Sequence, residues 1–175
     1  GRTGMIARMR KEMDETLAKL WEARAPDLVV ETPADALTLA SIVEKETALP
    51  AERPLVAAMF ENRLRRGMKL QSDPTVVYAI TKGSGPLGRR LTRADLETDS
   101  PYNTYQKMGL PPGPIGAPGR AAIEAVLHPA QSDALYFVAD GTGGHVFSRT
   151  LEEHNRNVER WRAEARRESY DPRPR

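Results

Sequence analysis

The sequence predicts an α+β fold: a single, mostly helical domain with one small antiparallel β element. Apolar residues recur at steps of three and four along most of the chain, which is the spacing of amphipathic helices. At several points of the chain, a Ser or Thr is followed within two residues by a proline, which is typical of a helix start. One pair of short apolar runs flanks a glycine-rich turn and is typical of a β-hairpin.

The first half of the chain is predicted to hold four helices. Thr32 acts as the N-cap of the second and Pro33 as its first residue, while Gly67 ends the third. Ser72, Asp73 and Pro74 form a similar start for the fourth. The predicted helices are residues 4–24, 33–47 and 54–67, and a segment that begins at 73.

The second half alternates loops with short regular elements. Residues 82–90 are rich in glycine and basic side chains, and residues 98–119 hold five prolines and four glycines, so both are predicted loops. Thr92 with Asp95, and Thr150 with Glu153, have the spacing of helix caps. Further predicted elements are a helix from 118, a hairpin of 135–139 with 145–148, and a last helix that ends near 168.

These elements suggest three parts. Residues 1–31 are expected to be an N-terminal helix and linker that remain from a longer upstream region, residues 32–168 the functional domain, and residues 169–175 a disordered tail. The chain of 175 residues has a net charge of +2, which does not favour nucleic acid binding. The short basic runs, 63–66 and 89–90, are interpreted as solvated helix ends or loops.

Several kinds of site are not expected. The chain has no cysteine, which excludes disulfides and cysteine-based zinc sites. The three histidines lack metal-ligand spacing, and no nucleotide-binding or nucleophile-elbow motif is present, so no metal and no cofactor are predicted. A membrane-spanning helix needs about 20 consecutive apolar residues, and no apolar run in this sequence approaches that length.

One glutamate lies in the apolar stripe of its predicted helix. At about 100° per residue, Glu46 falls about 20° from Leu39, whereas Glu44 falls about 140° away. Burial raises the pKa of a carboxyl group, and a glutamate that stays protonated near neutral pH can donate the proton that glycosidic bond cleavage needs. A buried structural glutamate, paired with an arginine or with backbone groups, is the alternative.

Two polar clusters are candidates for holding a sugar polymer. Tyr102, Asn103 and Tyr105 lie in the proline-rich loop, and aromatic faces and amide groups both bind sugars. Gln71 and Asp73 lie at the start of the fourth helix. The alternatives are that the tyrosines pack on the domain and that Ser72 and Asp73 only cap the helix.

Six segments in this order resemble one protein family. They are 40–47 (ASIVEKET), 62–68 (NRLRRGM), 70–78 (LQSDPTVVY), 102–105 (YNTY), 109–113 (GLPPG) and 136–141 (YFVADG). Together they are similar to the catalytic domain of endolytic murein transglycosylases of the MltG, or YceG-like, family. The likeness covers about residues 33–162.

The resemblance implies a peptidoglycan-cleaving enzyme with a lysozyme-like catalytic helix. The family's catalytic glutamate falls on Glu46, which would then donate a proton to the oxygen between N-acetylmuramic acid and N-acetylglucosamine and accept one from the muramic C6 hydroxyl. The product would carry a 1,6-anhydro end. Asp73, Asp95 and Glu97 are candidates if a second carboxylate takes part. A muramidase-like hydrolase and a non-catalytic peptidoglycan-binding module are the other interpretations.

The resemblance also implies a location and partners. A full-length member would be anchored in the cytoplasmic membrane of a bacterium, with the catalytic domain in the cell envelope outside the cytoplasm. Its partners would be peptidoglycan glycan strands and cell-wall synthases such as penicillin-binding proteins. The family's N-terminal transmembrane helix and LysM-like module are not visible intact in this sequence.

Overall fold

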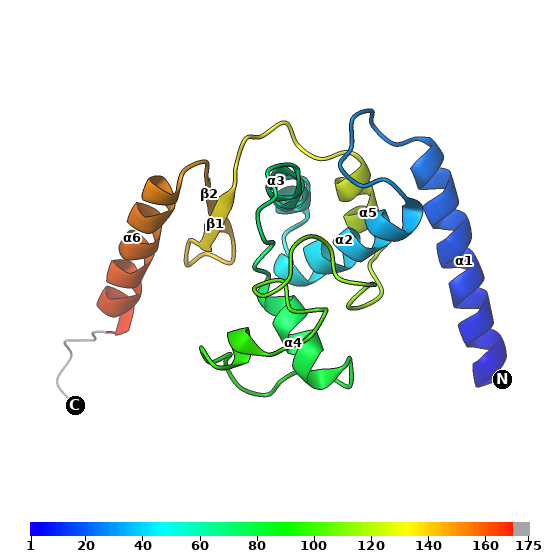
Figure 1. The fold of residues 1–175 in the computed structure, drawn as a ribbon, viewed down its shortest axis with the longest axis horizontal. Coiled ribbons are helices and arrows are strands. Elements are labelled where there is room, and N and C mark those ends of the chain that lie inside the picture. Colours follow the sequence, from blue (N-terminus) through cyan, green and yellow to red (C-terminus); the bar gives the residue numbers. More distant parts are fainter. Residues whose placement is uncertain (170–175) are drawn as a thin grey trace.

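The computed structural model describes residues 1–169, and this part of the chain contains six α-helices and one two-stranded sheet, which lies beside α6 (Figure 1). The α+β prediction with a small antiparallel element is confirmed. The elements are α1 (Arg2–Glu22), α2 (Pro33–Glu46), η1 (Pro50–Glu52), α3 (Arg53–Arg65), α4 (Asp73–Thr81), η2 (Asp95–Glu97), α5 (Arg120–Leu127), β1 (Tyr136–Ala139), β2 (His145–Ser148) and α6 (Leu151–Ser169).

Helix α2 lies at the centre of the helical core. It packs against α1, α3, α4 and α5, and its apolar residues Leu39, Ile42 and Val43 are fully buried. The hydroxyl of Thr32 accepts the backbone N–H of Asp35 at 3.1 Å, so the predicted N-cap is confirmed. This packing fixes the direction in which the C-terminal end of α2 points.

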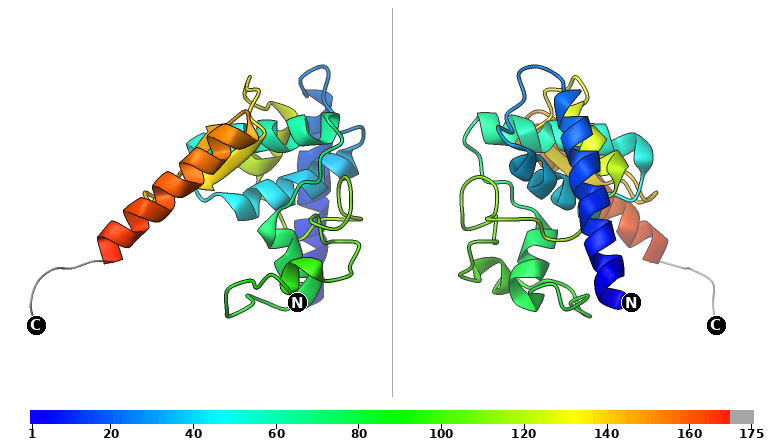
Figure 2. Two further views of the ribbon diagram at one scale, coloured as in Figure 1. Left: turned by 60° about the vertical axis from the view of Figure 1, so that its left-hand side comes forward. Right: turned by 90° about the vertical axis from the view of Figure 1, so that its right-hand side faces the viewer.

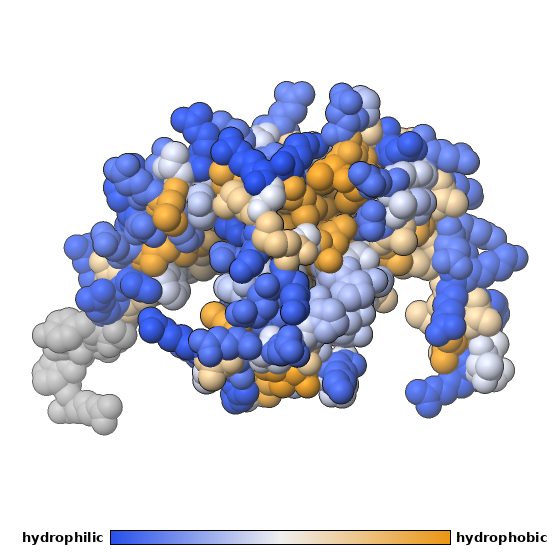
Figure 3. Space-filling view, in the orientation of Figure 1, coloured by the Kyte–Doolittle hydropathy of each residue, from blue (hydrophilic) through white to orange (hydrophobic). Residues whose placement is uncertain are grey.

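Helix α1 joins this core only through its C-terminal half. Leu17 is buried there, whereas Met5, Ile6 and Met9 are exposed. Figures 1 and 3 show the N-terminal end of α1 standing away from the rest of the molecule in that view. None of the helices within residues 1–169 has the length and apolar character needed to cross a lipid bilayer.

The β-hairpin lies between the helical core and α6. Strands β1 and β2 pair antiparallel, with Phe137 opposite Phe147 and Ala139 opposite His145. Phe137 also meets Phe60 of α3 edge to face, at 6.2 Å between ring centroids, which attaches the hairpin to the core. Helix α6 then leaves the hairpin and extends away from the body (Figures 1 and 2).

Most predicted boundaries agree with the structure to within about two residues. Thr92 and Asp95 exchange backbone–side-chain hydrogen bonds at η2, and the Thr150 hydroxyl accepts the N–H of Glu153 at the start of α6. Helix α5 begins at Arg120, two residues after the predicted start, because Gly119 has an extended backbone with ψ of 167°. The predicted disordered tail lies almost entirely outside the described residues.

Candidate active site

An open pocket of about 360 Å³ lies where the end of α2, the start of α4, the β-hairpin and α6 come together. Its wall combines carboxyl, basic and aromatic groups. The lining residues are Glu46, Arg63, Leu70, Gln71, Asp73, Tyr105, Tyr136, Phe137, Val138, Ala139, His145, Leu151 and His154. Three of the five substrate-binding candidates, Gln71, Asp73 and Tyr105, are therefore brought to the same pocket as Glu46.

Glu46 is the last residue of α2, and its carboxyl group lies in the pocket wall. Burial raises its pKa to about 7; a hydrogen bond from Ser72 lowers it, and the nearby charge of Asp73 raises it. A carboxyl group with this pKa is protonated in a large part of the molecules at neutral pH. Glu44 instead faces Arg53, at 3.9 Å, in agreement with the helical projection.

Ser72 connects Glu46 to the start of α4. It occupies the N-cap position, but its hydroxyl makes no cap bond and donates to Glu46 Oε1 at 2.6 Å. The interpretation that Ser72 only caps the helix is therefore wrong. Its neighbour Gln71 has a φ of 51°, a left-handed conformation that non-glycine residues seldom adopt, and this turn brings Ser72 to the glutamate.

Asp73 and Tyr105 form a second polar pair in the pocket. The Tyr105 hydroxyl donates to Asp73 Oδ1 at 2.5 Å. Burial and this hydrogen bond to the carboxylate raise the pKa of Tyr105 above its ordinary value, so the phenol stays protonated. The pair can offer carboxylate and hydroxyl groups to a sugar.

Tyr102 and Asn103 are not brought to the pocket. Asn103 is completely buried: its Nδ2 donates to the carbonyls of Leu96 and Thr98, and its Oδ1 accepts the N–H of Tyr105. Tyr102 packs against Tyr78, with 4.6 Å between ring centroids. The structure thus gives Asn103 a supporting position, because its amide shapes the loop that carries Tyr105.

Arg63 is a pocket residue that sequence reasoning assigned to a solvated run. It is buried, its Nε donates to Leu135 O at 2.6 Å, and its Nη1 donates to Lys69 O at 3.0 Å. Its guanidinium also lies 5.2 Å from the centre of the Tyr136 ring. Arg63 follows Met59 by four residues and Phe60 by three, which places it on the buried face of α3. This spacing is the feature of the sequence that could have predicted its burial.

Glu52 and His145 form a further pair that sequence reasoning missed. His145 Nδ1 lies 2.8 Å from Glu52 Oε2, although 93 residues separate them. Burial would raise the pKa of Glu52, but hydrogen bonds from His145 and Thr47 outweigh it and hold the pKa below its ordinary value. No local spacing connects residues so far apart.

The other carboxylates considered for catalysis lie elsewhere. Asp95 binds Arg89 through two hydrogen bonds, of 2.6 and 3.0 Å, and neither Asp95 nor Glu97 lines the pocket around Glu46. Asp73 is the one of the three candidates that does. Across residues 1–169, the structure contains no group of three or more His, Cys, Asp and Glu side chains placed to bind a metal ion.

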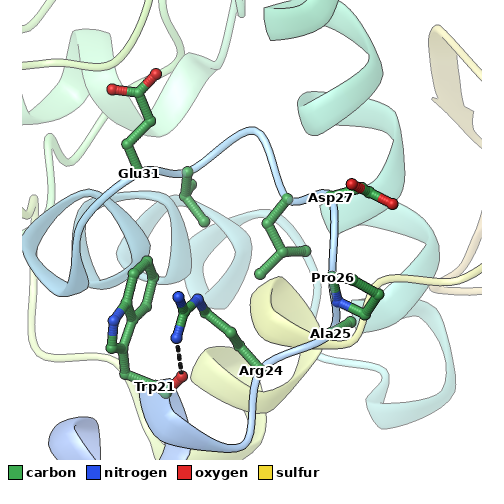
Figure 4. A pocket seen from close by; sticks show the side chains of 8 residues that line it. Trp21, Arg24, Ala25, Pro26, Asp27 and Glu31 are labelled. Carbon is green, nitrogen blue, oxygen red and sulfur yellow. Dashed lines mark hydrogen bonds between the residues drawn. The ribbon is translucent and has the colours of Figure 1, made fainter.

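A larger cavity, of about 580 Å³, lies between the end of α1 and the linker that follows it (Figure 4). Arg24 stacks over the Trp21 indole at 4.2 Å and donates to the Trp21 carbonyl at 2.9 Å. Arg24 is thus already engaged within the cavity wall, whereas Glu46, whose pKa is raised to about 7, lines the smaller pocket. The chemistry therefore points to the smaller pocket at Glu46.

Comparison with models of protein families assigns the sequence to a family. The model of the YceG-like family matches residues 2–160. The chain belongs to the YceG-like family. The match includes α1, all of the residues that line the Glu46 pocket and about half of α6.

Relatives of known name are similar over most of this chain. A Bacillus subtilis (strain 168) protein named endolytic murein transglycosylase is 48% identical over 125 residues, covering 71% of this chain and 34% of the relative. A Streptococcus pneumoniae (strain D39) protein of the same name is 41% identical over 161 residues, covering 88% of this chain and 28% of the relative. The chain thus spans about a third of the length of these relatives.

The fold is also similar to a solved structure of the family. A crystal structure of a YceG-like protein from Listeria monocytogenes matches with a TM-score of 0.68 and 44% sequence identity. The match covers 83% of this chain and 44% of the Listeria chain. The helices and hairpin that form the Glu46 pocket thus belong to a fold found in this YceG-like relative.

Proposed function

We propose that this protein cleaves the glycan strands of peptidoglycan as an endolytic transglycosylase, with Glu46 as the acid and base. The observation that carries the proposal is the Glu46 carboxyl group itself. It has a pKa of about 7, accepts a hydrogen bond from Ser72 at 2.6 Å and borders an open pocket. The names of the relatives support the choice of a murein glycan as substrate.

In the proposed reaction, protonated Glu46 donates its proton to the oxygen between N-acetylmuramic acid and N-acetylglucosamine as the bond from that oxygen to C1 breaks. The C6 hydroxyl of the same muramic sugar then attacks C1, and its proton returns to Glu46. The strand ends in a 1,6-anhydro muramic residue, and no water is consumed. One carboxyl group therefore completes the cycle unchanged.

The pocket supports a mechanism with a single reacting carboxylate. Asp73 also lines the pocket, but it accepts the hydroxyl of Tyr105 and is thereby held in place. We assign the Asp73–Tyr105 pair and Gln71 to glycan binding. Hydrolysis by an attacking water would need the same proton from Glu46, so product analysis has to separate the two reactions.

The test is mass spectrometry of purified glycan strands digested in water enriched in oxygen-18, with the longest form of the protein that can be purified. Anhydro-muramic ends without the heavy oxygen are expected, and they should be absent with Glu46→Gln. Reducing ends that carry oxygen-18 would instead establish a muramidase. Strands that bind the protein but stay intact would establish a binding module.

We also propose that the full protein is anchored in the cytoplasmic membrane, acts on glycan outside the cytoplasm and associates with penicillin-binding proteins. The family membership motivates this proposal. Cell fractionation and affinity capture from bacterial envelopes test it. Recovery in the cytoplasmic fraction, or capture without any cell-wall synthase, would contradict it.

A further inference from the structure

A second hollow adjoins the Glu46 pocket at Asp73. It is an open groove of about 590 Å³ between α4 and parts of the two loops that follow it. Asp73 lines both the groove and the pocket. The last two residues of α2 line one hollow each, Glu46 the pocket and Lys45 the groove. A bound molecule that extends past Asp73 can therefore occupy both.

The walls of this groove are mainly apolar. One face of α4 lines it, with residues at helical spacing: Pro74, Val77, Tyr78 and Thr81. Ile115 adds an apolar side chain from the loop before α5, and the Thr81 hydroxyl already accepts the N–H of Gly83 at 3.3 Å. Walls with so few hydrogen-bonding groups suit small apolar side chains better than the hydroxyl groups of a sugar.

Lys45 gives the groove its positive charge. Its Cε lies 3.3 Å from the place that a Cβ atom on Gly116 would take, so the glycine leaves room for the side chain against the loop. Within residues 1–169 the Lys45 ammonium group has no hydrogen-bond or ion-pair partner. The other charged residue of the groove, Asp73, accepts the Tyr105 hydroxyl instead. The groove thus offers an unpaired cation beside an apolar wall.

We propose that this groove binds the stem peptide of the muramic sugar on which Glu46 acts, and that Lys45 pairs with a carboxylate of that peptide. This inference rests on the proposed function, which places a muramic sugar at Glu46. The stem peptide is joined to the lactyl group of that sugar, is rich in alanine and carries carboxylates. Its methyl groups complement the apolar face of α4, and its carboxylates complement Lys45.

The test measures binding rather than cleavage, so its result is separate from the test of the proposed function. Glu46→Gln is titrated with glycan strands in three forms: with acetylated stem peptides, with the same peptides after their carboxylates are converted to methylamides, and with the peptides removed by an amidase. The peptide-bearing strands should bind most tightly. Methylamidation should weaken binding about fivefold, the upper range for an exposed ion pair, and removal of the peptide should weaken it at least as much.

Further substitutions in the Glu46→Gln chain assign the effect to the groove. Lys45→Met should bind peptide-bearing and methylamidated strands equally. Lys82→Met is the matched control and should keep the difference of about fivefold, because Lys82 is exposed at the end of α4 but does not line the groove. Val77→Phe narrows the groove without a change of charge, so it should weaken the binding of peptide-bearing strands and leave that of peptide-free strands unchanged.

Thermal melting checks that each variant is folded, because Lys45 also lies in the last turn of α2, where a cation stabilises the helix. Equal binding of the three strand forms to Glu46→Gln would overturn the proposal. Equal losses in Lys45→Met and Lys82→Met would also overturn it, since general attraction to an anionic strand gives that result. A loss in Lys45→Met that is the same for peptide-free strands would place the lactyl carboxylate at Lys45, and the groove would then not be a peptide site.

Discussion

Two glutamates in neighbouring helices, Glu46 of α2 and Glu61 of α3, have raised pKa values for the same first reason. Burial raises the pKa of Glu46 to about 7 and that of Glu61 to about 8. Their surroundings differ. Glu46 accepts the hydroxyl of Ser72 and borders the pocket, whereas Glu61 is completely buried and neither of its carboxyl oxygens has a hydrogen-bond partner among the described residues.

The difference shows that a raised pKa does not by itself identify a catalytic acid. A proton donor must also reach a substrate and be held in a defined orientation. Glu46 meets both conditions, because the pocket opens at its carboxyl group and Ser72 fixes it. Glu61 meets neither condition. Burying its carboxyl group without a hydrogen-bond partner therefore only lowers the free energy of unfolding.

The largest expected effect separates the two glutamates by activity. Glu46→Gln should slow glycan cleavage by about 1,000-fold or more, because glutamine has no proton to donate. Glu61→Gln should keep nearly the wild-type rate. Initial rates on purified glycan strands measure both. Equal losses in the two variants would mean that Glu46 acts through folding.

The second effect separates them by stability. The folded state raises the pKa of Glu61 from 4.5 to about 8, so the contribution of Glu61 to stability is greatest below pH 4.5 and declines as pH rises toward 8. Each pKa unit corresponds to about 1.4 kcal/mol in the free energy of unfolding. Glu61→Met should therefore stabilise the protein more at pH 8 than at pH 5.

Urea unfolding at several pH values measures this effect. In Glu46→Gln, the decline between pH 4.5 and about 7 should shrink while the decline up to about pH 8 remains. A stability curve of Glu61→Met that runs parallel to wild type at every pH would contradict the assignment to Glu61.

A smaller effect tests the hydrogen bond that distinguishes Glu46. Ser72→Ala removes a donor that stabilises the ionised carboxylate, so the pKa of Glu46 should rise. Activity that needs protonated Glu46 falls as pH rises through this pKa, and the fall should move up by about one pH unit. The pH dependence of kcat/KM measures it. A fall that stays at the wild-type pH would show that the bond does not tune the acid.

The smallest effect has the opposite sign. The negative charge of Asp73 raises the pKa of Glu46, so Asp73→Asn should lower it and move the fall in activity down by about half a pH unit. Because Asp73 also binds the Tyr105 hydroxyl, KM should be compared with that of Tyr105→Phe. A rise in KM common to both variants, without a pH shift in Tyr105→Phe, is the expected result.

Local patterns predicted most of the fold and part of the site. Helix spacing placed α1 to α4 to within about two residues, and the projection of α2 separated Glu46 from Glu44. The interpretation of the 98–119 loop as ordered also agrees with the structure, but the roles within it differ. Asn103 faces inward because its amide forms hydrogen bonds with backbone groups of the same loop. The composition of the loop does not show whether an asparagine binds the backbone or a substrate.

The sequence by itself determined the elements that depend on neighbours in the chain: helices from the three- and four-residue spacing, caps at Thr32 and Thr150, and the inward direction of Glu46. Only the tertiary structure decided which groups meet at the pocket. Ser72 reaches Glu46 across 26 residues and His145 reaches Glu52 across 93. Such contacts depend on how packed helices and the hairpin are placed in space, and no short-range periodicity encodes that placement.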